Sequence, residues 1–227
     1  MSNTETKLFA VLGNPIAHSL SPLLHSFFME QCHYNGVYLA FAPKKEELAQ
    51  AIAGLKALGA KGINVTIPYK EAVIPYLADL TPQAKICQAV NTLILTEKGF
   101  IGDNTDGNGL IKALEKQHGW QPEGRKILLI GAGGAAKGVA AAIARRQVAE
   151  IVIVNRTKEK AESLAKLLAQ HSECLIKVLD WDALQQETLY QNVDTFINTT
   201  PMGMSPHIEA MAPVRMECLC EDHMAVD

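Results

Sequence analysis

Short polar segments follow apolar runs at several places in the first half of the chain. Asn64 and Thr66 lie two residues apart in an extended run, so both side chains face the same side. Lys70 follows closely, and the segment Gly102–Gly107 supplies the carboxylate of Asp106. A lysine ammonium beside amide and hydroxyl groups can stabilise charge on an oxygen and donate a proton to it. The pattern is therefore suited to general acid–base chemistry.

Each of these residues also has an ordinary structural explanation. Ser21 stands directly before Pro22, where a serine is suited to cap a helix. Asp106 is equally suited to cap the helix expected after it, and a single lysine such as Lys70 is most often a solvated surface residue. Taken one at a time, these residues do not establish a function.

A second constellation is suited to bind a phosphate-rich ligand. The apolar run Lys126–Ile130 leads directly into Gly131-Ala132-Gly133-Gly134-Ala135-Ala136, and an Ala-rich helix follows. Gly131 permits the tight turn, Gly133 lets the backbone approach a pyrophosphate at the positive end of the helix, and Ala136 takes the third motif position. The pattern predicts the first strand, turn and helix of a dinucleotide-binding domain.

The end of the next apolar run indicates which dinucleotide is bound. Ile151–Val154 leads into Asn155-Arg156-Thr157, with Lys160 shortly after. A carboxylate in this place would accept a hydrogen bond from the ribose 2′-hydroxyl of NAD, whereas a guanidinium suits the 2′-phosphate of NADP. A solvated charge at a strand end is the ordinary alternative for Arg156, but the neighbouring glycine turn makes it the weaker explanation. We therefore expect NADP.

Considered together, these segments resemble the shikimate dehydrogenase family. The motifs that carry the resemblance occur in family order from about residue 7 to the end of the chain: His18–Pro22, Asn64–Lys70, Ala89–Thr92, Gly102–Gly107, Gly131–Ala136, Asn155–Thr157 and Asn198–Met204. The resemblance implies reversible NADP-dependent reduction of 3-dehydroshikimate to shikimate, a step of chorismate and aromatic amino-acid biosynthesis.

The resemblance also implies roles for individual residues. Lys70 and Asp106 are the expected catalytic pair and are expected to titrate as a coupled unit; which of them transfers the proton stays open. The expected substrate-binding residues are Ser19, Ser21, Asn64, Thr66 and Asn91. The expected cofactor-binding residues are Gly131, Ala132, Gly133, Gly134, Ala135, Asn155, Arg156, Thr157, Lys160, Thr199 and Thr200. Lys137 stands where many relatives carry arginine, which leaves one cation near the cofactor.

Strands and helices are expected to alternate through both halves of the chain. This pattern predicts an α/β protein, with a mostly parallel sheet in a substrate-binding domain over residues 1–120 and a Rossmann-type NADP-binding domain over 121–227. The turn-rich segment at 119–124 marks the expected boundary. The family continues past residue 227 with a further strand, a glutamine-bearing segment and a final helix, so we expect the second domain to be incomplete at its carboxyl end.

The expected elements follow from the periodicity of the apolar residues. Strands are expected over Leu8–Leu12, Val37–Ala42, Gly62–Ile67, Asn91–Thr96, Phe100–Ile101, Lys126–Ile130, Glu150–Val154, Leu175–Leu179 and Val193–Asn198, and another is expected to open at Met224. Helices are expected over Pro22–Tyr34, Glu46–Leu58, Lys70–Leu77, Gly109–His118, Gly134–Arg146 and Lys158–Gln170. The residues around Glu97-Lys98-Gly99 are expected to turn a short hairpin.

Composition and charge limit the class of protein. The 227 residues are 48% hydrophobic and 20% charged, which is typical of a soluble globular protein. A net charge of −3 argues against general nucleic-acid binding, and no run is long enough to span a bilayer. The polar amino terminus and the five cysteines without ligand spacing indicate a cytoplasmic protein with reduced thiols and no metal site. We expect a small-molecule substrate, no nucleic-acid or membrane partner, and a monomer or homodimer.

Two other functions stay open. A paralogue that also oxidises quinate, often with NAD, would be favoured by an acidic residue in place of Arg156. A non-catalytic NADP-binding relative would have kept the fold and lost turnover, which the presence of both Lys70 and Asp106 opposes.

Overall fold

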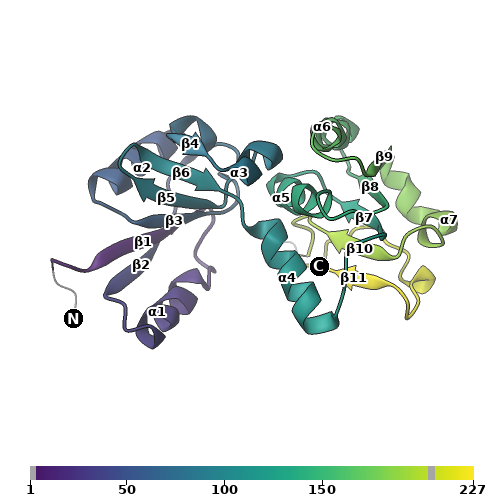
Figure 1. The fold of residues 1–227 in the computed structure, drawn as a ribbon, viewed down its shortest axis with the longest axis horizontal. Coiled ribbons are helices and arrows are strands. Elements are labelled where there is room, and N and C mark those ends of the chain that lie inside the picture. The colour runs from purple at the N-terminus through teal and green to yellow at the C-terminus, as the bar shows by residue number, and fades with distance from the viewer. Residues whose placement is uncertain (1–3, 204–207) are drawn as a thin grey trace. The chain divides into compact units, whose positions relative to one another are not determined.

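The chain consists of two compact units, which we describe from a computed structural model that covers residues 4–203 and 208–227. The units are Met1–Thr105 and Asp106–Asp227 (Figure 1). The boundary expected near residue 120 assigns the helix that begins at Asp106 to the first domain. By its packing, that helix belongs to the second unit.

The first unit is built on a six-stranded sheet in the order β2-β1-β3-β5-β6-β4. Its strands are β1 (Lys7–Leu12), β2 (Gly36–Phe41), β3 (Gly62–Val65), β4 (Asp79–Leu80), β5 (Thr92–Thr96) and β6 (Gly99–Asp103). β5 runs antiparallel to both of its neighbours, and the other pairs are parallel. The mostly parallel sheet and the β5–β6 hairpin agree with the pattern of apolar residues.

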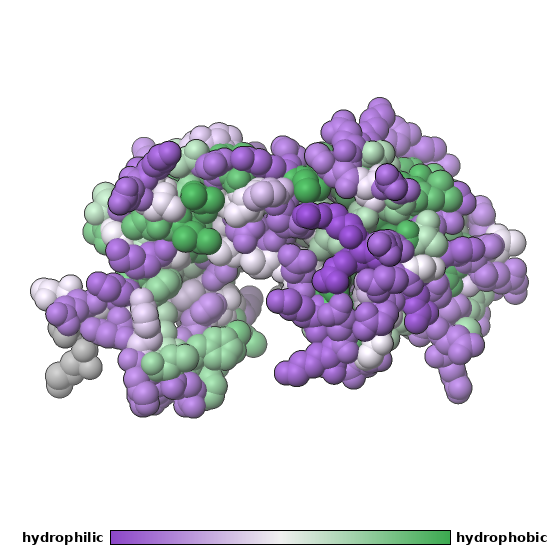
Figure 2. All heavy atoms as spheres, in the orientation of Figure 1, coloured by the Kyte–Doolittle hydropathy of each residue, from purple (hydrophilic) through white to green (hydrophobic). Residues whose placement is uncertain are grey.

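The helices of the first unit differ in how many of their residues are buried. They are α1 (Ser21–Gln31), α2 (Leu48–Ala57) and α3 (Pro82–Cys87), with 3-10 turns η1 (Lys45–Glu47) and η2 (Ile74–Tyr76). α2 buries Leu48, Ile52 and Leu55 in the core of the unit, at the spacing of one helix face. α1 buries none of its residues, and Figure 2 shows a hydrophobic patch over this helix. One face of the sheet is therefore much more densely packed than the other.

The helix expected over Lys70–Leu77 is wrong. The structure has turns at 70–73 and then η2. A proline has no N–H to donate and its ring clashes with the carbonyl four residues earlier, so Pro75 opposes a continuous helix. One helical hydrogen bond forms before it, from the Val73 N–H to the Tyr69 carbonyl at 3.0 Å. Lys70 consequently lies in a turn.

The sequence pattern did not indicate α3, which starts directly after Thr81. The Thr81 hydroxyl accepts a hydrogen bond from the Ala84 N–H at 3.2 Å, and Pro82 follows the cap. A threonine cap before a proline is a recognised start signal, but the helix has only six residues and offers little periodicity to detect.

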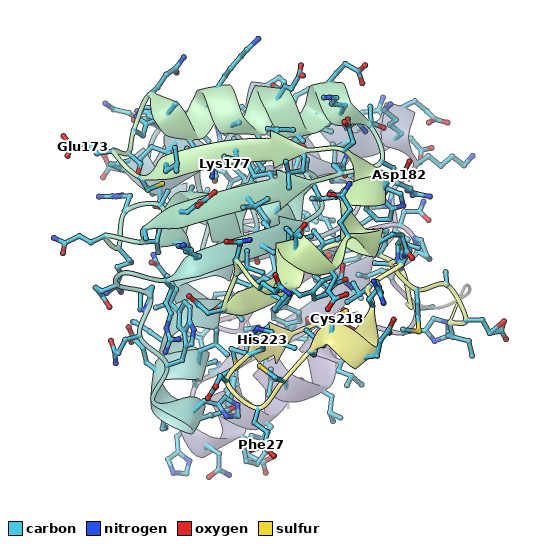
Figure 3. The ribbon with its side chains drawn as sticks, turned by 90° about the vertical axis from the view of Figure 1, so that its right-hand side faces the viewer. Phe27, Glu173, Lys177, Asp182, Cys218 and His223 are labelled. Carbon is cyan, nitrogen blue, oxygen red and sulfur yellow. The ribbon has the colours of Figure 1, made fainter. Side chains whose placement is uncertain are left out.

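The second unit is built on a five-stranded parallel sheet in the order β11-β10-β7-β8-β9 (Figure 3). The strands are β7 (Lys126–Ile130), β8 (Glu150–Val154), β9 (Leu175–Leu179), β10 (Thr195–Asn198) and β11 (Met224–Val226). Counted along the unit, the spatial order is 5-4-1-2-3, which is the order of doubly wound dinucleotide-binding folds. The expected Rossmann-type domain is confirmed.

The helices of the second unit include one very close crossing. They are α4 (Asp106–His118), α5 (Gly134–Ile143), α6 (Lys158–Ala169) and α7 (Glu187–Tyr190), with 3-10 turns η3 (Trp181–Gln185) and η4 (Met216–Cys218). A Cβ added to Gly107 would overlap the Gly138 carbonyl oxygen and the Ala142 methyl group. Only glycine at this position lets α4 approach α5 so closely. The contact explains why the helix that begins at Asp106 packs with the second unit.

Candidate functional site

The expected substrate-binding residues of the first unit lie where β3 ends and β5 begins. Asn64 is on β3, in register with Thr92 of β5, and Thr66 directly follows the strand. The Asn91 carbonyl accepts from the Val65 N–H at 2.8 Å and from Asn64 Nδ2 at 3.5 Å. These hydrogen bonds hold Asn64 and Asn91 together at the carboxyl end of β3, directly before Thr66.

The alternation of β3 sets the direction of Asn64. Ile63 and Val65 are buried in the core, and Asn64 between them is half-buried on the opposite face. Thr66 is also half-buried, and a Cβ on Gly13 would overlap its methyl group. Gly13, which the sequence pattern did not single out, therefore makes room for Thr66.

Lys70 is half-buried and its backbone is fixed to the segment that carries Asn91. The Lys70 carbonyl accepts from the Val90 N–H at 2.7 Å, one residue before Asn91. A hydrogen bond this short between two loops holds the start of the lysine side chain in a defined place, which is what a positioned acid requires.

The loop that precedes Asp106 is fixed to the same segment by amide side chains. Asn91 Nδ2 donates to Thr105 Oγ1 at 3.0 Å, and the Thr105 N–H donates to Asn91 Oδ1 at 3.0 Å. Asn104 is 1% exposed, and its Nδ2 donates to the Ala89 carbonyl at 3.1 Å. Asp106 directly follows Thr105 and is the first residue of α4, where a negative charge is favourable. Asn104 lies inside the Gly102–Gly107 motif, so its type was visible but its structural role was not.

The two serines lie at the start of α1, and the structure rejects the capping explanation for Ser21. The N-cap residue is Leu20, and it makes no side-chain cap hydrogen bond. The Ser21 N–H donates instead to Ser19 Oγ at 3.3 Å. The Ser21 side chain is half-buried beside Tyr38, a residue that the sequence pattern did not single out.

The glycine turn of the second unit has the backbone that its motif requires. Gly131 has a φ of +116°, and a Cβ on it would lie 2.5 Å from Thr199 Oγ1. Thr199 itself donates from its hydroxyl to the Ile130 carbonyl at 2.8 Å. Gly131 is therefore required by the fold, both for its conformation and for the approach of the loop after β10.

Gly133 differs from Gly131 in what it contacts. A Cβ on Gly133 would meet no atom of the described chain within 4 Å, and its φ of −85° suits any residue. The packing of the protein therefore does not explain this glycine. α5 begins at the next residue with no side-chain cap, so its first N–H groups are available to an anion. These features fit the diphosphate of a dinucleotide.

The cationic side chains after β8 differ in whether a carboxylate of the protein pairs with them. Lys158 Nζ lies 2.7 Å from Asp180 Oδ1, and the hydrogen bond that its ammonium donates to this carboxylate raises the pKa of Lys158. Arg156 and Lys160 are exposed and form no ion pair with any residue in 4–203 or 208–227. Asn155 shapes the turn by donating from Nδ2 to the Thr157 carbonyl at 2.8 Å. The guanidinium expected to bind a 2′-phosphate is thus not neutralised by any carboxylate of the described residues.

The segment after β10 is also shaped by hydrogen bonds of its own side chains. Asn198 Oδ1 accepts from the Thr200 N–H at 3.0 Å and from the Thr200 hydroxyl at 2.8 Å. This turn directs the chain back past the glycine turn, where Thr199 contacts Gly131. The end of the expected motif, Met204, lies outside the described residues.

The part of the chain that the structure describes offers neither a cluster of metal ligands nor a helix suited to cross a membrane. It contains no group of three or more His, Cys, Asp or Glu side chains that could hold a metal ion. Cys218 and His223, on the segment before β11 in Figure 3, have other environments: His223 packs against Phe196, with ring centroids 5.1 Å apart. None of the described helices combines the length and apolar character that crossing a membrane requires.

Comparison with known proteins gives consistent matches in both halves of the chain. The family described as "Shikimate dehydrogenase substrate binding domain" matches residues 11–93, and "Shikimate / quinate 5-dehydrogenase" matches 113–202. The NADP(+)-dependent shikimate dehydrogenase of Caldanaerobacter subterraneus subsp. tengcongensis is 41% identical over 226 residues, which cover 99% of this chain and 79% of the relative.

Solved structures extend the similarity to the fold. A shikimate dehydrogenase in complex with NADP+ has a TM-score of 0.90 and 39% identity, with 99% of this chain and 77% of that chain covered. Shikimate 5-dehydrogenase from Listeria monocytogenes, in complex with shikimate and NAD, has a TM-score of 0.89 and 30% identity, with 99% and 78% covered.

Proposed function

Because this chain belongs to the shikimate dehydrogenase family, we propose that it is an NADP-dependent oxidoreductase that reversibly reduces 3-dehydroshikimate to shikimate. The observation that carries the proposal is the polar edge of the first unit, where Asn64 and Asn91 are held together directly before Thr66 and the Lys70 turn is bonded to the same segment. Such an edge suits a small ligand with several hydroxyl groups. The reaction is a step in the biosynthesis of aromatic amino acids.

The proposed catalytic pair is Lys70 and Asp106. Lys70, as an ammonium ion, stabilises the charge that develops on the ketone oxygen and donates a proton to it. Asp106 keeps the lysine charged and oriented and accepts a hydrogen bond from the same hydroxyl. The proposed substrate-binding residues are Ser19, Ser21, Asn64, Thr66 and Asn91, which offer hydroxyl and amide groups to the carboxylate and hydroxyls of the ligand.

The proposed cofactor residues fit NADP on observations of this chain. NADPH, when bound, supplies the hydride. Gly133 and the uncapped start of α5 offer backbone N–H groups to its diphosphate, and Arg156 with Lys160 offers positive charge to its 2′-phosphate. Asn155, Thr157, Thr199 and Thr200 shape the two turns beside these groups.

The partner of this chain is therefore a small molecule, and we further propose that nucleic acid and membrane are not partners. A net charge of −3 gives no basis for general attraction to a phosphate backbone. We propose a cytoplasmic enzyme that acts as a monomer or a homodimer.

A second candidate function is oxidation of quinate, because one matching family is described as shikimate / quinate 5-dehydrogenase. Initial rates of cofactor reduction with shikimate or quinate, each with NADP or NAD, separate the two functions. We expect the highest kcat/KM for shikimate with NADP. A preference for quinate would select the second candidate. Binding of NADP without turnover of either substrate would select a non-catalytic relative.

A further inference from the structure

Tyr38 of β2 lies on the same face of the sheet as Asn64. Tyr38 is in register with Phe9 of β1, and Phe9 with Gly62 of β3, two residues before Asn64. Because side chains alternate along a strand, Tyr38 and Asn64 point to the same side. The tyrosine is 5% exposed, and its ring is stacked on His25 of α1, with centroids 4.2 Å apart and an angle of 1° between the planes.

The hydroxyl of Tyr38 reaches the amide of Asn64. The phenol oxygen lies 2.6 Å from Asn64 Oδ1, and Oδ1 can only accept, so the phenol donates. The other end of the amide is fixed independently, because Nδ2 lies 3.5 Å from the Asn91 carbonyl, which also can only accept. A flipped amide would place two acceptors together at Asn91 and would remove the acceptor of the phenol proton. The two partners thus select one orientation of Asn64.

This orientation leaves the donor side of Asn64 for a ligand. Among the residues that the structure describes, Nδ2 donates only to the Asn91 carbonyl, so its second hydrogen remains for a ligand oxygen. The phenol oxygen also takes a hydrogen bond from the Ser21 side chain, and the Ser21 N–H donates to Ser19 Oγ. Tyr38 therefore joins the serines at the start of α1 to the polar edge at the end of β3.

We infer that Tyr38 is a positioning residue for shikimate, which acts by holding Asn64 in the orientation that donates to a ligand hydroxyl. The inference rests on the proposed function, since it assigns the ligand of the same edge. It adds a residue that acts through Asn64, by determining which side of the Asn64 amide faces a ligand.

The protonation states of the groups around Tyr38 agree with this role. Burial raises the pKa of Tyr38 to about 12, so the phenol keeps the proton that it donates at neutral and moderately alkaline pH. Burial also lowers the pKa of His25, which favours the neutral imidazole on the tyrosine ring.

The test is Tyr38→Phe, which keeps the ring on His25 and removes only the hydroxyl. We expect KM and the calorimetric Kd for shikimate to rise about tenfold, the usual effect of one hydrogen bond that orients a ligand group. Since Asn64 would contact the ligand in the ground state and the transition state alike, kcat should change by less than about threefold, and KM for NADP should stay constant.

Two further variants separate positioning from a loss of structure. Tyr190→Phe is the matched control, because the buried Tyr190 hydroxyl donates to the Leu184 carbonyl and accepts from the Arg215 N–H within the second unit. It should lower Tm and leave KM for shikimate unchanged. In an Asn64→Ala background, Tyr38→Phe should change the Kd for shikimate by less than about twofold, because the group that it positions is gone.

The outcomes are distinguishable. A Tyr38→Phe variant with the Kd and KM of the wild type overturns the inference and leaves the proposed function intact. A tenfold loss that persists in the Asn64→Ala background also overturns it, because Tyr38 would then act on the fold in general. A wild-type chain that neither binds nor oxidises shikimate overturns the proposed function, and the inference with it.

Discussion

The two halves of the proposed active site are built in opposite ways. In the cofactor half, the part expected to hold the diphosphate is one continuous turn, in which Gly131 and Gly133 give the backbone its course and α5 supplies the N–H groups. The substrate half is assembled from separate loops, which hydrogen bonds between side chains such as Asn91 and Thr105 hold together.

This difference determines what a mutation can reveal. In a turn whose backbone contacts the ligand, a substitution changes the backbone conformation or fills the space that the ligand needs. In an assembly of loops, a substitution acts through loss of a hydrogen-bond partner, and the effect spreads to every loop that the partner held. Substitutions in the two halves should therefore differ in what they change.

The largest effect is expected at the proposed proton donor. Lys70→Met should lower kcat by about two to four orders of magnitude, the usual range for a positioned acid–base group. The Kd for shikimate should change much less, because Asn64, Thr66 and Asn91 remain. Asp106→Asn should lose turnover comparably, and the double variant should lose no more than either alone, because the two residues act together.

Steady-state kinetics and calorimetry on the same preparations test this expectation. Near wild-type turnover in Lys70→Met would remove the lysine from the mechanism. Losses that multiply in the double variant would mean that the two residues do not act as a pair.

The next largest effect is expected at the exposed guanidinium. Arg156→Asp removes a charge-assisted contact to a 2′-phosphate worth about 1.5–3 kcal/mol, which is about one to two decades in affinity. The new carboxylate can accept from a ribose 2′-hydroxyl, so preference should move from NADP towards NAD. The measurement is the ratio of kcat/KM values for the two cofactors. An unchanged ratio would show that the phosphate binds elsewhere.

The two glycines of the cofactor turn should respond differently to the same substitution. Gly131→Ala forces an alanine to a φ of +116° and against Thr199, so it should lower Tm by several degrees, about 2–4 °C for each kcal/mol lost. Gly133→Ala meets no atom of the described chain, so Tm should be unchanged while the Kd for NADP rises about tenfold. If both variants lose stability equally, Gly133 has a structural role and the turn is not open to a ligand.

The smallest effect is expected at Lys158, which stands two residues from Arg156. Its ammonium is already paired with Asp180 on the protein surface, and such exposed pairs contribute little. Lys158→Ala should therefore change the Kd for NADP by less than about twofold, measured by the same titration as for Arg156→Asp. A tenfold loss would show that Lys158 leaves Asp180 to bind the cofactor.

The contrast between the two halves also explains what could be predicted from the sequence. The cofactor half depends on residues that stand close together in the sequence. The periodicity of the apolar residues predicts the strand Lys126–Ile130 and the end of β8, and the glycines with the helix dipole predict the turn between strand and helix. β8 and β9 have the bounds expected from their apolar runs. The type of chemistry at Lys70 was also visible, because amide, hydroxyl and lysine stand close together along the chain.

The residues that the sequence did not indicate act across long separations. Tyr38 is an unremarkable strand tyrosine until the register of three strands places it opposite Asn64, 26 residues away. Gly13 matters because of Thr66, and Gly107 because α5 crosses α4 at this residue. The helix expected over Lys70–Leu77 is wrong for a local reason, since Pro75 opposes a helix that the apolar spacing favours.

The most direct test of the account is the reaction in its biosynthetic direction. The chain is incubated with 3-dehydroshikimate and NADPH, and the loss of NADPH is compared with the shikimate formed, measured by chromatography, in the wild type and in Lys70→Met. We expect one shikimate for each NADPH consumed, at a rate at least about a hundredfold above that of the variant. Equal rates in the wild type and the variant, or NADPH consumption without shikimate, would contradict it.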